Sequence, residues 1–182
     1  MPDYLATSDG CGILGSPTQP REFKMSIYSE LFQKICREVY PAYKTIYSNH
    51  PIQTHGGDPD GAKIHSHLLL IVEIIIYEYR KKHAATFEPL KGDKALKHIL
   101  FTKYNVSIPD LELMTLEKIV FALLKELSPE NLPLSAQNYV NGIELNQKAA
   151  GIDWSLEVNW ILGSGESTLG SLDVKPENQI DL

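Results

Sequence analysis

The sequence predicts a mainly α-helical fold, an irregular helical bundle packed around one buried central helix. Residues 61–83 carry the strongest apolar signal in the chain, and no turn residue interrupts them. A helix that is apolar on nearly every side is typical of the buried centre of a bundle. Amphipathic segments with helical spacing stand before and after this stretch, so we expect them to pack around it.

Two apolar stripes follow the helical repeat within the predicted central helix. The first consists of Ile64, Leu68, Ile71 and Ile75, and the second of Leu69, Val72, Ile76 and Tyr79. A narrow polar line remains, made of Glu73, Tyr77 and Arg80. Because a buried carboxylate without a partner has a raised pKa, we expect Glu73 to face this polar line.

Shorter helices are predicted on both sides of the central one. Ser26 can cap a helix that continues to about Tyr40, where Pro41 lacks an N–H and disfavours helical geometry at the residue before it. Later caps and apolar spacings predict helices from Asp93 to Lys103, from Ser107, from Thr115 to Leu127, and from Ser135 to about Ala149. The buried face of the helix after Thr115 is expected to consist of Leu116, Ile119, Val120, Leu123, Leu124 and Leu127.

Apolar and polar residues alternate between Trp154 and Leu162, which is the period of a β-strand. A lone strand needs a partner, and the chain after the glycine-rich loop at 163–165 could supply one. A small β-hairpin near residues 154–174 is therefore one interpretation. The other is a final helix capped by Asp153, and the pattern alone leaves both open.

One domain accounts for most of the chain. Glycine, proline and small polar residues dominate residues 1–24, which we interpret as a disordered N-terminal segment. Residues 25–174 form the predicted single helical domain, and residues 175–182 a frayed C-terminal tail. Two cysteines are too few for a disulfide framework, and we find no signal peptide or membrane span, so we expect a cytoplasmic protein.

Charge is distributed unevenly along the chain. Residues 80–103 carry seven basic and two acidic residues, a net charge of +5, whereas residues 104–182 carry four lysines and twelve acidic residues, a net charge of −8. The whole chain has a net charge of −6. Because non-specific nucleic-acid binding depends on lysine and arginine, this balance disfavours nucleic acid as a partner.

Histidine and aspartate gather in and just after the loop that precedes the central helix. The group consists of His50, His55, Asp58, Asp60, His65 and His67. Imidazole and carboxylate groups together can bind a transition metal, so a metal-dependent hydrolase or nuclease that uses residues 50–67 is the alternative function. On a helix, however, His65 and His67 project about 200° apart and cannot share one ion.

The favoured function is non-enzymatic binding of another protein, because no motif in the chain demands a particular chemistry. An acidic helical protein can act as an immunity protein or an antitoxin-like inhibitor, since its charge attracts and orients a basic partner. The candidate partner-binding residues are Glu117, Glu126, Glu130, Glu144, Asp153 and Glu157.

We expect the protein to hold no metal and no other cofactor. Elemental analysis of protein purified without an affinity tag should show no stoichiometric zinc, manganese, iron or nickel. One bound equivalent that disappears when His55 and His65 are changed to alanine would instead support the hydrolase or nuclease.

Overall fold

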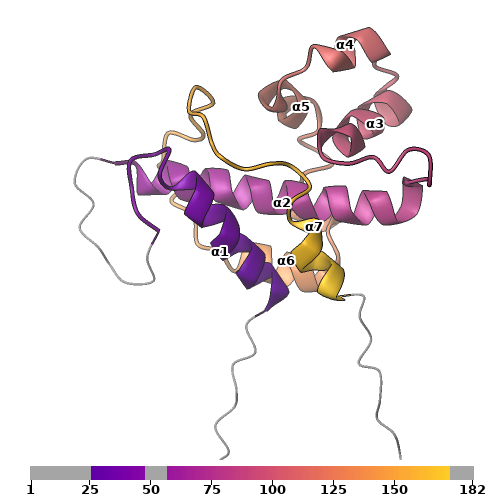
Figure 1. Cartoon of the computed structure of the whole chain (residues 1–182). Helices are drawn as coiled ribbons and strands as arrows, with labels where there is room; N and C mark the ends of the chain where they lie inside the picture. Colours follow the sequence, from indigo (N-terminus) through magenta and orange to yellow (C-terminus); the bar gives the residue numbers. More distant parts are fainter. Residues whose placement is uncertain (1–25, 48–56, 173–182) are drawn as a thin grey trace, which may run out of the picture.

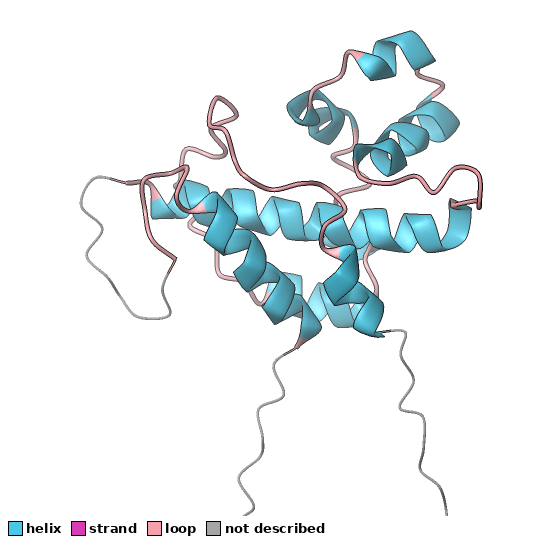
Figure 2. Ribbon diagram, viewed as in Figure 1, coloured by secondary structure: helices cyan, strands magenta, loops and turns pink. Residues whose placement is uncertain are grey.

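The computed structural model describes residues 26–47 and 57–172, and these are mainly helical, as predicted (Figures 1 and 2). The α-helices are α1 (Ile27–Val39), α2 (Pro59–His83), α3 (Asp93–Tyr104), α4 (Ile108–Glu112), α5 (Leu116–Ala122), α6 (Leu134–Asn141) and α7 (Glu166–Leu169). Two short 3-10 helices are η1 (Pro129–Asn131) and η2 (Gly170–Leu172). The predicted segments 1–24 and 175–182 lie outside the described residues, as do His50 and His55.

Helix α2 is the centre of the fold. It begins two residues before the predicted start, because Pro59 occupies the first turn and the Asp58 carboxylate accepts a hydrogen bond from Gly61 N–H at 2.8 Å. Helices α1, α6 and α7 pack against it, and α3 packs against it from another side. Helices α4 and α5 contact α3, so α3, α4 and α5 form a lobe beside α2 (Figure 1).

The two apolar stripes of α2 differ in burial. Leu69, Val72 and Ile76 of the second stripe are buried, and of the first stripe only Ile71 is. The first stripe otherwise stays partly exposed, at Ile64, Leu68 and Ile75. The face of α2 that contains Ile75 is therefore less completely covered than its opposite face.

Helix α1 ends where Pro41 predicts. The Ser26 hydroxyl accepts a hydrogen bond from Ser29 N–H at the start of α1, and turns replace the helix from Tyr40 to Lys44. These turns bring Tyr43 into the core, where it is buried against α2. The chain does not resume a helix after Pro41 in the residues described, up to Tyr47.

Two of the later helices are shorter than predicted. Thr115 caps α5 as expected, but α5 ends at Ala122 and turns follow it up to Leu127. Helix α6 ends at Asn141, before Gly142, and does not continue to Ala149. Asparagine and glycine have low helix propensity, which explains the early end of α6.

The β-hairpin predicted near residues 154–174 does not form in the part that the structure describes, and the alternative helix capped by Asp153 does not form either. Residues 157–161 have no regular secondary structure and no neighbouring strand, and turns or a bend occupy residues 154–156 and 162–165. Residues 166–172 are helical instead of returning as a second strand. Backbone without a helix or a ladder needs other hydrogen-bond partners. Glu73 supplies one set of these, as described below.

Among the described residues, no helix is both long enough and apolar enough to cross a membrane. Helix α2 has 25 residues, but charged residues occupy both its ends and Glu73 its middle.

Replacing Ile71 with alanine should destabilise the fold by about 2–5 kcal/mol, because the buried side chain would leave a cavity beside α2. Replacing Ile75 should cost less, since this side chain is only partly buried. Urea unfolding of both variants measures the difference. Equal losses would mean that Ile71 and Ile75 are equally buried in solution.

Candidate functional site

A segment without helix or strand between α6 and α7 lies across the central helix (Figure 1), and we call residues 152–165 the strap. Figure 1 shows the strap passing over α2 and ending at α7. Its alternate side chains are partly buried against the core: Trp154, Leu156, Val158, Trp160 and Leu162. The side chains between them are exposed. The alternation of apolar and polar residues in the sequence therefore reflects one partly buried and one exposed face of this segment, although no sheet is present in the described residues.

The Glu73 carboxylate holds the C-terminal half of the strap. Its Oε1 accepts hydrogen bonds from Trp160 Nε1–H at 2.9 Å and Gly163 N–H at 2.7 Å. Its Oε2 accepts a third from Gly165 N–H at 2.9 Å. Glu73 is only 1% exposed, so these donors replace water as its hydrogen-bond partners.

Glu73 and Arg80 face adjacent residues of the chain, Gly165 and Glu166, so the predicted line is present, but Glu73 is buried on it and bonds to the strap. Arg80 bonds to the Glu166 carboxylate and to the Pro89 carbonyl. Burial raises the pKa of Glu73, while the hydrogen bonds from Trp160 and the two strap glycines oppose that rise. Glu73 is thus a buried carboxylate with an internal set of donors, and it joins α2 to the strap.

Glycine is required where the strap meets Glu73. A Cβ atom at position 165 would lie 2.7 Å from Oε2 of Glu73, which leaves no room for a larger residue. Gly163 has a φ angle of +87°, a conformation that other residues adopt at a cost. These two glycines allow the backbone N–H groups to approach the carboxylate closely.

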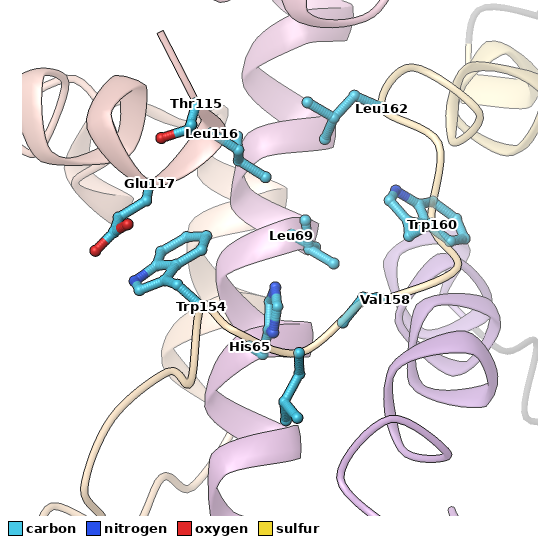
Figure 3. Close-up of a pocket in the computed structure, with 10 residues that line it drawn as sticks. His65, Leu69, Thr115, Leu116, Glu117, Trp154, Val158, Trp160 and Leu162 are labelled. Carbon is cyan, nitrogen blue, oxygen red and sulfur yellow. The ribbon is translucent and has the colours of Figure 1, made fainter.

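The strap, α2 and the start of α5 enclose a pocket of about 280 Å³, which we call the Trp154 pocket. Figure 3 shows Trp154 between Glu117 of α5 and His65 of α2. Apolar side chains form most of the wall, and the polar lining groups are His65, Thr115 and Glu117. The complete lining is His65, Leu69, Thr115, Leu116, Glu117, Trp154, Leu156, Val158, Trp160 and Leu162.

His65 is a neutral group in this pocket at pH 7. Burial lowers the pKa of His65 to about 4. The Tyr43 hydroxyl accepts a hydrogen bond from Asp153 N–H at 3.2 Å and lies 3.1 Å from His65 Nδ1. Each of these groups is satisfied if the Tyr43 hydroxyl donates to Nδ1, which places the imidazole proton on Nε2.

A second groove, of about 620 Å³, lies on the outer side of α5, and we call it the α5 groove. Leu113, Phe121 and Leu124, on or near this side of the lobe, are 79%, 77% and 61% exposed. The groove is lined by Met114, Glu117, Lys118, Val120, Phe121, Ala122, Leu124 and Trp154. Glu117 and Trp154 line both this groove and the Trp154 pocket, so the two hollows adjoin.

The structure places the predicted partner-binding acids in different surroundings. Only Glu117 lines the two hollows. Asp153 and Glu157 are exposed on the strap, and Glu130 and Glu144 are exposed elsewhere. Glu126 is engaged within the fold, because its carboxylate accepts a hydrogen bond from the Tyr104 hydroxyl at 2.7 Å and lies 3.5 Å from Lys103 Nζ.

The described members of the predicted metal group have separate structural partners. His65 contacts Tyr43, whereas His67 Nε2 lies 3.2 Å from the Val140 carbonyl of α6. Asp58 caps α2, and Asp60 accepts a hydrogen bond from Asn146 at 2.7 Å. Within residues 26–47 and 57–172, no three histidine, cysteine or acidic side chains are arranged to hold a metal ion.

The basic stretch 80–103 is largely paired within the fold. Besides the pair of Arg80 with Glu166, the ion pairs are Lys94 with Glu88, Lys97 with Asp93, and Lys103 with Glu126. Cys36 is buried, and burial raises the pKa of its thiol to about 12. The thiol is therefore protonated at neutral pH and poorly nucleophilic.

Sequence analysis missed both the α5 groove and the role of Glu73. It assigned Leu124 to the buried face of a helix up to Leu127, but α5 ends earlier and Leu124 is exposed. The signal for the groove was the number of apolar residues after Thr115. One helix face cannot bury all of them, so Phe121 and Leu124 could be expected on the surface. A lone glutamate in the apolar run was a signal for Glu73, but its donors are 87–92 positions away.

Comparisons with protein-family models, curated proteins and solved structures found no match to this chain. Function is therefore inferred from the contacts, burial and charge of its own residues.

Replacing Glu73 with glutamine should lower the free energy of unfolding by about 1–3 kcal/mol, although the two side chains have nearly the same shape. The amide would direct an N–H group at donors of the strap and leave at least one without an acceptor. Urea unfolding followed by tryptophan fluorescence measures this loss. Glu78→Gln, on a partly exposed position of α2, is the matched control and should change little.

The same pair of proteins should differ in pH dependence. Because the folded pKa of Glu73 is raised, its contribution to stability is present below the pKa of the unfolded chain and is lost as pH rises through the folded pKa. The advantage of the natural protein over Glu73→Gln should therefore shrink as pH rises. An advantage that grows with pH would mean that the three hydrogen bonds outweigh the cost of burial.

Proposed function

We propose that this protein is a non-enzymatic binding protein that holds a basic, amphipathic segment of another protein in the α5 groove. The observation that carries the proposal is the exposure of Phe121 and Leu124 in the lining of that groove, with exposed Leu113 next to the lining residue Met114 in the chain. Exposed apolar clusters bordered by polar residues are typical of protein-binding surfaces. An amphipathic helix laid in such a groove would bury these side chains.

Charge supports a basic occupant. Glu117 lines the groove, and Asp110 and Glu112 are exposed on α4 just before Leu113. Lys118 is the basic residue of the groove lining. Residues 104–182 together have a net charge of −8, from four lysines and twelve acidic residues, so a positively charged partner would be attracted at long range.

An inhibitor of the immunity-protein or antitoxin type fits this arrangement, with the cytoplasm as the compartment. Such a protein would cover the basic surface with which its partner contacts nucleic acid or another polyanion. Within the proposal Glu117 is the central acidic contact. Asp153 and Glu157 extend the acidic surface along the strap. Glu126 is less available to a partner, because its carboxylate already contacts Tyr104 and Lys103.

The proposal is tested by selecting peptides from a random display library on the immobilised protein and measuring their dissociation constants. Enriched peptides should combine lysine or arginine with apolar residues at helical spacing. Phe121→Ser or Leu124→Ser should weaken their binding about tenfold or more, because each removes a large apolar contact. Added salt should also weaken binding through screening.

Leu134→Ser is the matched control, because Leu134 is 71% exposed but lies on α6. It should leave peptide affinity unchanged, and circular dichroism should confirm that all variants remain helical. Selected peptides without basic residues, or peptides that bind the two groove variants as tightly as the natural protein, would contradict the proposal.

A further inference from the structure

We propose that the Trp154 pocket receives one lysine or arginine side chain of the bound segment, with Trp154 as its aromatic contact and Glu117 as its counter-charge. This inference rests on the proposed function and assigns a specific residue class to one position of the partner. It follows from the continuity, the size and the charge of the pocket.

Continuity comes from the two residues that both hollows share. Glu117 and Trp154 line the α5 groove and also the Trp154 pocket. A segment lying on α5 therefore passes these two side chains, and Figure 3 shows Glu117 next to the Trp154 ring. A side chain that leaves the segment at this point can enter without any change in the path of the backbone.

Size and wall chemistry suit a long side chain. The volume of about 280 Å³ is just below the range of about 300–1,000 Å³ that is common for small-molecule sites. Leu116, Leu156 and Val158 offer an apolar wall for a methylene stem. Lysine and arginine have such a stem beneath a charged group, and they commonly bury the stem while the charge stays near water.

Charge selects a cation for the end of that side chain. Glu117 is the one carboxylate in the pocket lining, and the described lining contains no lysine or arginine. His65 adds no positive charge at pH 7, because burial keeps its pKa near 4. Trp154 is the aromatic side chain best suited to contact a cation, through the negative face of its ring.

Contacts with His65 and Tyr43 fix the position of Trp154. Its ring centroid lies 5.5 Å from that of His65, with 57° between the planes. His65 is itself held by Tyr43, whose hydroxyl also accepts the N–H of Asp153, the residue before Trp154. The aromatic contact is therefore pre-organised, which reduces the entropy lost when the cation binds.

A double-mutant cycle tests the inference. Each lysine or arginine of a selected peptide is replaced in turn by norleucine, and affinity is measured for the natural protein and for Glu117→Gln. With the natural protein, the replacement at one position should weaken affinity about tenfold. With Glu117→Gln this loss should largely disappear, because the peptide cation has then already lost its counter-charge. Glu130→Gln, at an exposed position outside both hollows, is the matched control and should preserve the loss.

Fluorescence gives a second measurement that needs no selected peptide. The chain contains two tryptophans, Trp154 and Trp160, and both line the pocket. Acetyl-arginine amide or acetyl-lysine amide should change their emission saturably, and acetyl-norleucine amide should not. Glu117→Gln should abolish the response, whereas Glu130→Gln should not.

The outcomes separate this inference from the proposed function. Peptides that depend on Phe121 and Leu124, but lose affinity equally at every basic position in both backgrounds, would leave the groove intact and overturn the cation pocket. A fluorescence response confined to cationic amides and dependent on Glu117, without any peptide bound at the groove, would support the cation pocket and overturn the proposed function. Absence of both the peptide coupling and the amide response would overturn the inference outright.

Discussion

The carboxylate of Glu73 joins the central helix to the C-terminal half of the strap. The strap contains no helix and has no neighbouring strand among the described residues, so its backbone N–H groups depend on other acceptors. Glu73 accepts two of them, from Gly163 and Gly165, together with the indole N–H of Trp160. In return these donors satisfy a charge that α2 carries into the core, where an unpaired carboxylate would be costly.

This contact positions the candidate site, although it is not part of the binding surface. Because Glu73 binds Trp160 and the two glycines, one face of the strap packs on the core. Trp154, in the same strap, contacts His65. The other end of the strap is held through Tyr43, which the turns after α1 bring into the core. Polar contacts thus hold both ends of the strap, and apolar side chains lie between these contacts. The Trp154 pocket lies between the apolar side chains of the strap and α5.

The lobe of α3, α4 and α5 supplies the exposed part of the surface. Helices α4 and α5 are short and contact α3, and each can bury only a few side chains. Ile119, Val120 and Leu123 face the core, which leaves Phe121 and Leu124 on the outside. The same brevity that limits burial therefore creates the α5 groove. Both the apolar surface and the acidic residues beside it are available to a partner without any change in the fold.

The sequence alone determined the helical class, the central helix and most helix starts, because apolar periodicity and capping residues such as Ser26 and Thr115 act within a few residues of chain. It also showed the alternation of apolar and polar residues in the strap, but left a strand and a helix both open for that segment. Only the tertiary structure decided that Trp154–Leu162 forms no hairpin, that Glu73 is buried and bonded, and that Leu124 is exposed. Each of these depends on groups distant in the sequence, whose proximity no local pattern encodes.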